Sequence, residues 1–244
     1  MEITWLTQGG FVFEQDGERL AVDPYLSDFV EQTDGLKRLC PAPVPVNKLS
    51  PAAVFCTHHH PDHLDPVAIP QIAQRWPACL FAGPFAAMQR CRQLGVDPQR
   101  LRTVGCGESL TVGPFALKAV IAHHGQTEAV GLLVEAEGGL VYVSGDSEYH
   151  EELAEDVSVE ADRRIDLVLI CINGRWGNMS GDEALKVVGQ LKPVAASPMH
   201  YGLFAENTAD PKPFVRGCLA MGVRSAALTA GRATPIAELT GSQT

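Results

Sequence analysis

The sequence lacks the features that would place it among secreted, membrane or nucleic-acid-binding proteins. Its seven cysteines form no Cys-x-x-Cys pair, no apolar run approaches membrane-spanning length, and Met1 begins no charged leader with an apolar core. Lys and Arg number 19 against 29 Asp and Glu, and the net charge of −10 argues against nucleic acid or an anionic membrane as the main partner. A local basic pocket is still compatible with this balance. We therefore expect a reduced, cytoplasmic protein that acts on a small molecule.

Short apolar stretches, rather than long ones, carry the fold. They predict strands at residues 5–6, 11–13, 19–22, 54–57, 80–82, 109–112, 115–122, 130–135, 139–144, 165–172, 194–197 and 226–229. Helices are expected at residues 65–75, 84–94, 149–156, 180–191 and 211–221. This order predicts an α/β fold in one domain over residues 1–244, with two packed mixed sheets covered by helices on both outer faces.

Residues 25–50 interrupt this pattern with several prolines and little periodicity. Loops of this length inside a compact domain are often functional. We expect this excursion to form a lid or a contact between subunits of a homo-oligomer.

The most informative stretch is 57–63, which reads Thr-His-His-His-Pro-Asp-His and follows the apolar run 52–56. On an extended strand end, the side chains of His58 and His60 point to the same side and can meet at one ion. His59, between them, should point away. An exposed histidine-rich turn is the alternative, but the internal position and the preceding strand pattern favour a metal site.

Pro61 cannot continue a strand ladder, so the chain should turn there. The turn would direct Asp62 and His63 toward a second point beside the first. The spacing therefore predicts two adjacent metal sites.

Further candidate ligands also stand just past apolar strands. His123 and His124 follow the strand at 115–122, Asp146 follows a Ser-Gly turn, and His200 lies in Ser-Pro-Met-His-Tyr. Each alone is as easily a turn residue or a satisfied polar residue. Together with the first cluster they favour one site at the ends of several strands.

These motifs resemble those of the metallo-β-lactamase superfamily, from about Ile3 to about Pro235. Within it, the chain is similar to the L-ascorbate-6-phosphate lactonase-like branch, through four stretches: Trp5-Leu6-x-Gln8-x-Gly10-Phe11, Asp23-Pro24-Tyr25-Leu26-Ser27-Asp28, Ile172-Asn173-Gly174-Arg175-x-Gly177-Asn178-Met179 and Pro198-Met199-His200-Tyr201-Gly202. The resemblance implies an αββα sandwich. It does not identify a substrate.

The resemblance also implies a set of ligands for two divalent ions. The first metal would be held by His58, His60 and His124, with His123 as the competing third ligand. The second would be held by Asp62, His63 and His200, with Asp146 bridging. Mixed imidazole and carboxylate ligands accept Zn, Mn or Fe, and relatives in this branch suggest Mn or Zn.

Such a site predicts hydrolysis by a metal-activated hydroxide. Asp62 is placed to orient the hydroxide and carry its proton to the leaving group, and Asp146 completes the predicted catalytic pair. No Gly-x-Ser-x-Gly elbow surrounds Ser144, and no covalent nucleophile is required. Because His60 stands where the diiron oxygen-reducing relatives have Glu, the resemblance favours a hydrolase.

We predict a lactone or ester of a small, anionic, sugar-like compound as the substrate. The residues expected to bind it are Asn173, Arg175, Asn178 and Tyr201. The Arg175 guanidinium can pair with a phosphate or carboxylate, although a structural turn with Arg175 in a salt bridge fits equally well. Two other functions stay open: hydrolysis of a small phosphodiester, and a non-enzymatic metal-binding or regulatory protein that keeps the fold.

Overall fold

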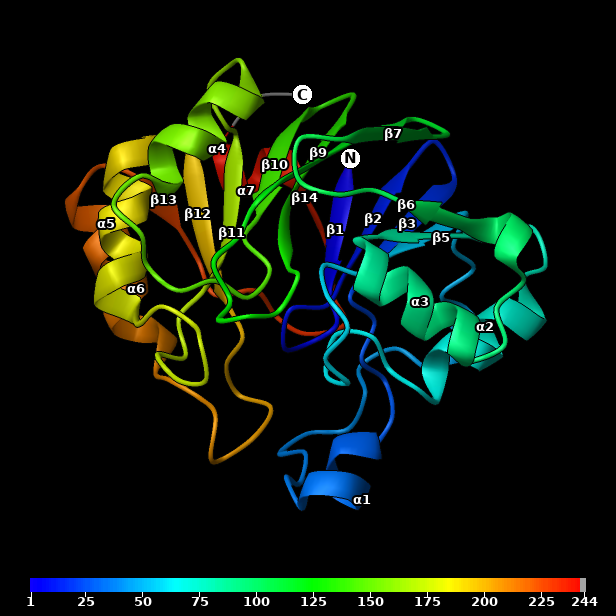
Figure 1. Cartoon of the computed structure of the whole chain (residues 1–244). Helices are drawn as coiled ribbons and strands as arrows, with labels where there is room; N and C mark the ends of the chain where they lie inside the picture. The colour runs from blue at the N-terminus through cyan, green and yellow to red at the C-terminus, as the bar shows by residue number, and fades with distance from the viewer. Residues whose placement is uncertain (242–244) are drawn as a thin grey trace.

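Two mixed β-sheets form the centre of the computed structural model, which describes residues 1–241 (Figure 1). In spatial order the first sheet contains β14 (Ala233–Pro235), β1 (Glu2–Trp5), β2 (Phe11–Gln15), β3 (Glu18–Val22), β4 (Ala53–Phe55), β5 (Leu80–Gly83) and β6 (Leu101–Thr103). The second contains β13 (Arg224–Ser225), β12 (Ala195–Met199), β11 (Leu167–Cys171), β10 (Gly139–Val143), β9 (Val130–Ala136), β8 (Phe115–Ile121) and β7 (Ser109–Val112).

Helices cover the outer face of each sheet, as predicted. The first sheet carries α2 (Ala68–Arg75) and α3 (Phe85–Gln93), and the second carries α4 (Leu153–Ala161), α5 (Gly181–Leu191) and α6 (Pro211–Ala220) (Figure 1). The remaining helical segments are α1 (Phe29–Asp34), η1 (Val46–Lys48), η2 (Pro98–Arg100) and α7 (Ile236–Thr240). The predicted αββα layering is confirmed. Within the described part of the chain, no helix is both long and apolar enough to cross a bilayer.

Alternation along the strands of the first sheet explains the layers. Phe11 and Phe13 face the core between the two sheets, whereas Val12 faces the helices α2 and α3. In β4, Phe55 likewise faces the core between the sheets, and Val54 faces the helices. Successive side chains of a strand point to opposite faces, so each strand serves two apolar layers at once. Since the largest core cluster joins both sheets, we keep the single domain over 1–244 as a proposal, with residues 242–244 outside the described part.

The strand directions bring the ends of distant segments to one edge. In the second sheet β8 and β10 both run antiparallel to β9, and β11 and β12 run parallel to β10. The carboxyl ends of these four strands therefore meet at the same edge. The loops there lie at the lower side of Figure 1, while both chain termini lie at the upper side.

Several expected elements differ from the observed ones. The strand expected at 226–229 is absent; this segment crosses from β13 in one sheet to β14 in the other, and Leu228 is buried in the core without strand pairing. The helix expected at 149–156 begins only at Leu153. Just before the predicted start, the N–H of Glu148 donates to the carbonyl of His123. The strand β6 and the short helix α1 inside the 25–50 excursion had not been predicted.

A capping box forms the start of α5. The Ser180 hydroxyl accepts a hydrogen bond from the N–H of Glu183, and the Glu183 carboxylate accepts one from the N–H of Ser180. We expect Ser180→Ala to lower the free energy of unfolding by about 1 kcal/mol, because the N–H of Glu183 loses the hydroxyl that accepts its hydrogen bond. Ser180→Thr, which keeps the hydroxyl, should lose less. Urea unfolding of the three proteins measures this, and equal stability of Ala and Thr variants would contradict it.

Candidate metal centre

Ligand-type side chains from both sheets converge at the shared edge. Three groups each bring their donor atoms within 4.8 Å of one another: His58, His60 and His124; His58, His63 and Asp146; Asp62, His63 and His200. These groups overlap through His58 and His63. The structure thus gathers all seven residues that the sequence proposed as metal ligands. Their role as ligands stays a prediction.

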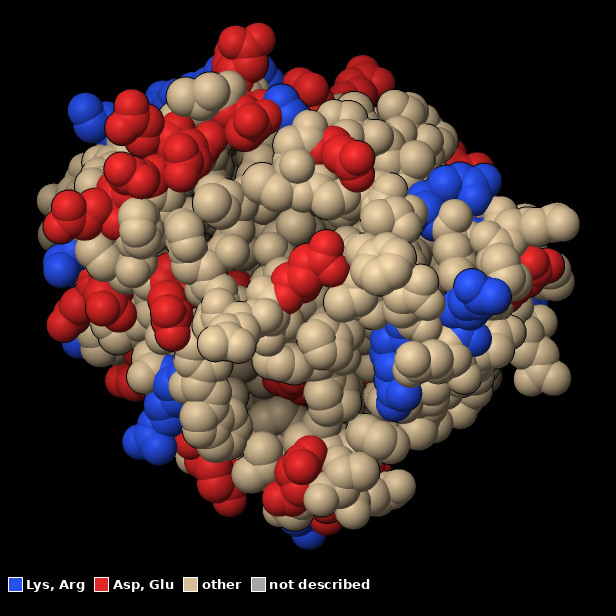
Figure 2. Space-filling view, viewed as in Figure 1, with Lys and Arg blue, Asp and Glu red and all other residues tan. Residues whose placement is uncertain are grey.

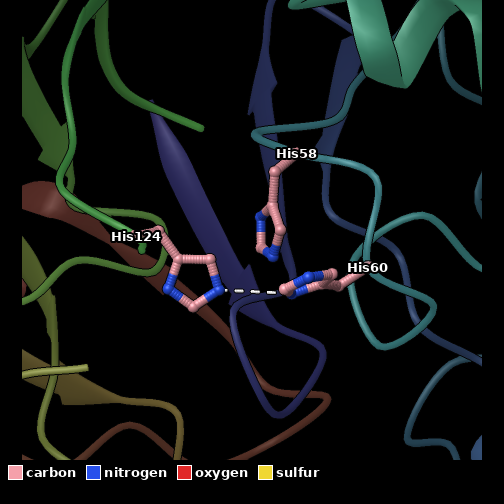
Figure 3. A group of neighbouring side chains, drawn as sticks. All are labelled: His58, His60 and His124. Carbon is pink, nitrogen blue, oxygen red and sulfur yellow. Dashed lines mark hydrogen bonds between the residues drawn. The ribbon is translucent and has the colours of Figure 1, made fainter. Parts of the chain in front are cut away.

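The first group consists of three imidazoles. In Figure 3, His58 and His60 enter from one side and His124 from the other, and their rings point toward one another. His124 Nε2 lies 3.2 Å from His60 Nδ1. His58 and His60 come from the loop after β4, and His124 follows β8, so this group joins the two sheets.

The second group contains two imidazoles and a carboxylate. His63 Nε2 and His200 Nε2 lie 3.3 Å apart, and Asp62 Oδ2 lies 3.8 and 3.7 Å from them, respectively. The chain reaches this arrangement through a turn at Pro61, where the N–H of His63 donates to the carbonyl of His60. The turn that the sequence predicted at this proline is present.

Asp146 lies between the two groups. Its Oδ1 is 3.1 Å from both His63 Nε2 and His200 Nε2, while its Oδ2 is 3.9 Å from His124 Nε2. One oxygen thus faces the second group and the other faces the first. This is the placement that a bridging carboxylate needs.

Hydrogen bonds behind the rings of His58, His63 and His124 fix which nitrogen each of these three imidazoles presents. The Thr57 hydroxyl donates to Asp23 at 2.6 Å, so it can accept only from His58 Nδ1–H, which lies 3.1 Å away. His63 Nδ1 lies 2.8 Å from Asp23 Oδ2, and His124 Nδ1 lies 2.9 Å from the carbonyl of Gly177. With each Nδ1 carrying the proton, the Nε2 lone pairs point into the site, as metal-binding imidazoles require.

Asp23 is the hub of this outer layer. Its carboxylate is fully buried and also accepts a hydrogen bond from the N–H of Thr57 at 2.7 Å. It therefore orients His58 through Thr57 and His63 directly. A carboxylate behind a ligating imidazole holds the ring in place and raises its basicity.

Gln8 performs a similar task for the second group. Its side-chain Nε2 donates to Asp62 Oδ2 at 2.9 Å, and its carbonyl accepts from the N–H of His200 at 3.0 Å. The backbone of His200 has φ 61°, a left-handed conformation that a non-glycine residue adopts only when its surroundings hold it. Gln8 thus fixes one candidate ligand from each sheet, Asp62 and His200.

Two glycines make room for the rings. A Cβ at Gly9 would lie 2.7 Å from His63 Cε1, and a Cβ at Gly177 would lie 2.8 Å from His124 Nδ1. Both contacts are closer than a side chain allows. Glycine at these positions lets the backbone approach the imidazoles directly.

Burial and charge set the protonation of the site. Burial, helped by the neighbouring His63, holds the pKa of His58 well below its usual value, so this imidazole is neutral near pH 7. Burial alone would lower the pKa of His63, but the carboxylates of Asp146 and Asp23 outweigh it and hold that pKa well above the usual value. Burial likewise would raise the pKa of Asp146, but His200 and His63 keep it well below its usual range. The centre therefore favours ionised carboxylates around a positive charge.

The donor atoms fit a pair of divalent cations. His58 Nε2 is buried and makes no hydrogen bond, which is costly unless a cation accepts its lone pair. Imidazole nitrogens and carboxylate oxygens are the usual ligands of Zn and of other first-row divalent metals.

The remaining histidines lie away from this centre. His123 stacks on His150 with ring centroids 4.5 Å apart, so His123 is turned out of the group that contains His124. His59 is exposed, as the sequence indicated. The geometry thus supports His124 over His123 as the third ligand.

The residues expected to bind substrate occupy different places. Asn173 donates to Asn207 at 2.7 Å and accepts from Asn178 at 3.1 Å, so these buried amides hold the loop after β11 together. Tyr201 is buried and lies against Trp5, with ring centroids 4.9 Å apart. Arg175 is exposed and donates to the carbonyl of Glu206 at 3.4 Å. Of the four, Arg175 is the one that presents its charge to solvent, and direct substrate contact by any of them stays a prediction.

A cavity of about 400 Å³ opens next to the second group. Its lining includes His60 from the first group of candidate ligands and Asp62 from the second. The other lining residues come from the 25–50 excursion and from the loops after β11 and β12: Val30, Asp34, Leu36, Pro61, Trp176, Phe204 and Asn207. A substrate in this cavity would reach both groups of ligands.

Sequence reasoning had given no role at the site to Asp23, Thr57 or Gln8. Asp23 had been named only within a stretch that carries the family resemblance, although it follows the carboxyl end of β3, next to β4. Neighbouring parallel strands end at the same edge, so this position could have placed Asp23 beside the histidine cluster. Nothing in the local sequence indicates the contact between Gln8 and Asp62, which are 54 positions apart.

Known proteins share both the sequence pattern and the fold. The family described as the Beta-lactamase superfamily domain matches residues 2–200. A UPF0173 metal-dependent hydrolase of Methanopyrus kandleri is 30% identical over 226 residues, covering 88% of this chain and 90% of that protein. A metallo hydrolase of Ignicoccus hospitalis superposes with a TM-score of 0.75 at 21% identity, covering 96% of this chain and 97% of the other. A metallo-β-lactamase fold protein of Bacillus subtilis gives 0.70 at 16% identity, covering 96% and 98%; the likenesses to the two structures show the fold.

Replacing each of the two adjacent histidines tests the third ligand. We expect His124→Ala to lower the metal bound per chain and to weaken its retention about 10-fold to 100-fold or more, because an imidazole is lost from the first group. His123→Ala is the matched control and should retain the metal of the unchanged protein. Metal content after dialysis, measured by elemental analysis, decides between them. Loss of metal in His123→Ala alone would reverse the assignment.

Proposed function

Because the chain belongs to the beta-lactamase superfamily and is a metal-dependent hydrolase, we propose that it holds two divalent ions and hydrolyses a lactone or ester with them. The observation that carries this proposal is the position of Asp146 between two groups of ligands, at the edge of a cavity lined by His60 and Asp62. His58, His60 and His124 would hold the first ion, Asp62, His63 and His200 the second, with Asp146 shared. Zn or Mn fits these ligands, and Fe is also compatible.

When bound, such ions lower the pKa of a coordinated water and polarise a substrate carbonyl. The chain itself positions the participants. His60 and Asp62 line the cavity, so a carbonyl group placed there lies against the ligands of both metals. The hydrogen bond from Gln8 holds Asp62 Oδ2 and leaves the other carboxylate oxygen for proton transfer.

Asp62 has the position of a proton carrier, since it is about one-fifth exposed and faces both the cavity and His200. The oxygen of water forms a bond to the carbonyl carbon, and the carbon–oxygen bond of the lactone or ester breaks. Asp62 takes the proton of the water and returns it to the departing alkoxide oxygen. The reaction is balanced without a covalent intermediate on the protein.

The lactonase-like substrate class comes from the sequence resemblance, and the anionic group is expected at Arg175. This side chain lies at the rim, because its neighbour Trp176 lines the cavity and its partner Glu206 is next to Asn207, which also lines it. We further propose a reduced, cytoplasmic setting, since all seven cysteines are free and most are buried. Acidic residues gather over α4, which agrees with a small-molecule partner rather than nucleic acid (Figure 2).

Chelation and replacement of Asp62 test the proposed reaction. We expect removal of metal to abolish turnover of lactones and esters, and added Zn or Mn to restore it. Asp62→Ala should lower kcat by about 100-fold or more, because proton transfer and one ligand are lost. Asp182→Ala, an exposed position on α5, is the control and should keep full activity.

The measurement is turnover on a panel of lactones, carboxylic esters and small phosphodiesters, with metal content determined in parallel. Phosphodiester cleavage alone would indicate the other hydrolytic function. Full metal occupancy without turnover of any substrate would instead favour a binding or regulatory protein.

Arg175→Ala tests the anionic end of the substrate. We expect KM for an anionic ester to rise about tenfold or more, and KM for its neutral analogue to stay nearly unchanged, because a charge-assisted hydrogen bond is lost only from the former. Steady-state kinetics on the matched pair measure this. Equal changes in both KM values would show that Arg175 has only a structural role.

A further inference from the structure

The cavity beside the metal cluster has apolar walls. Val30 and Leu36 come from the 25–50 excursion, Phe204 follows β12, and Trp176 follows β11. His60 and Asp62 lie at its inner end, next to the other ligands. A volume of about 400 Å³ lies within the range of small-molecule sites, which are mostly apolar with a few polar groups.

The wall from the excursion is fixed in place. Val30 packs with Tyr25, Leu203 and Phe204 in a separate apolar cluster, and the N–H of Leu39 donates to the carbonyl of Leu203 at 2.7 Å. Asp65 ties the start of the excursion to the metal-binding loop by accepting hydrogen bonds from the N–H groups of residues 26 and 27 at 2.9 and 2.8 Å. The cavity is therefore preformed. The excursion, which had been expected to act as a lid or an oligomer contact, here forms one side of the cavity.

Trp176 forms the opposite side of the cavity, and both its exposure and its backbone conformation are unusual for tryptophan. Its side chain is 59% exposed, and its backbone has φ 52°, a strained conformation for a bulky residue. Strain of this kind persists at sites where function requires a particular placement. A large aromatic ring held open to solvent beside the metal cluster offers a flat contact for an apolar group.

The charged residues of the cavity disfavour an anion in the part of the cavity that lies away from the candidate metal ligands. Its charged lining residues, Asp34 and Asp62, are both acidic, and its described lining contains no Lys or Arg. On the face in Figure 2, the surface beside the lobe formed by α1 is hollowed, and uncharged and acidic atoms border the hollow. A phosphate or carboxylate inside the cavity would lose hydration without gaining a cation, except at the metal end.

We propose that the substrate carries an apolar acyl or aryl group that fills this cavity, with its scissile carbonyl at His60 and Asp62. This inference rests on the proposed hydrolysis of a lactone or ester, and it specifies the part of the substrate that does not react. Any anionic group lies outside the cavity, toward Arg175. A compact phosphorylated sugar would leave the apolar walls without a partner.

A series of neutral esters with lengthening unbranched acyl chains tests the inference. Each added methylene should raise kcat/KM about fourfold until the cavity is full, because each buries apolar surface. For esters whose acyl chains of the same length end in a carboxylate, kcat/KM should not rise in this way. Turnover that is independent of chain length, or higher with the terminal carboxylate, would overturn the inference while leaving the proposed hydrolysis intact.

Two pairs of variants locate the effect. Leu36→Asp should lower kcat/KM for the longest neutral ester about tenfold, whereas Leu39→Asp, at an exposed side chain three residues away, should not. Asp34→Lys should raise kcat/KM for the esters with a terminal carboxylate. Glu31→Lys makes the same charge change on α1 outside the cavity lining, and it should leave this kcat/KM unchanged. Equal effects within either pair would contradict the assigned wall. Thermal unfolding confirms that each variant is folded.

Binding without turnover separates this inference from the proposed function. Unbranched alcohols from butanol to octanol, which cannot be hydrolysed, should quench or shift the fluorescence of Trp176 with affinity rising along the series. Trp176→Phe removes the signal and leaves Trp5 and Trp76 as background. Graded binding without hydrolysis of any ester would refute the proposed function and support the cavity. Absence of graded binding, together with ester hydrolysis independent of chain length, would refute the cavity alone.

Discussion

The buried carboxylate of Asp23 is the constraint on which the metal centre depends. It holds the Thr57 backbone and hydroxyl, and through Thr57 it sets the tautomer of His58, while its other contact orients His63. One group thus fixes an imidazole in each half of the centre. A buried carboxylate is costly unless its oxygens are satisfied, and here three donors surround it. The outer layer thereby determines where the ligands can point before any ion is bound.

The packing of two sheets is the second requirement. The loop after β4 supplies candidate ligands from one sheet, and the loops after β8, β10 and β12 supply the candidates His124, Asp146 and His200 from the other. Gln8 joins the halves, since its side chain bonds to Asp62 and its carbonyl to the backbone of His200. These residues cannot come together in either sheet alone, so the packing of the two sheets positions the candidate metal centre as well as stabilising the fold.

The sequence allowed the layers to be predicted, and it singled out the seven residues that the fold brings together, for identifiable reasons. Apolar stretches bounded by Gly and Pro marked most strands, and ligands standing just past those strands converge whenever the strands run parallel. The choice between His123 and His124 could not be made locally, because it depends on His123 stacking against His150. The strand expected at 226–229 is absent because this segment crosses between the sheets, with Leu228 in the core and Ala226 and Ala227 exposed. Asp23 and Gln8 act through contacts distant in sequence, which no local pattern reveals.

The same topology separates the candidate metal centre from the cavity wall that we propose selects the substrate. The metal centre rests on strand ends and buried hydrogen bonds, whereas the far wall of the cavity is a small apolar cluster of its own around Tyr25 and Phe204. Arg38 covers that cluster, with its guanidinium 5.0 Å from the Tyr25 ring centroid. This cluster shares no buried residue with the two larger core clusters. A fold that keeps the chemistry on strand ends can therefore alter substrate preference through the excursion between β3 and β4.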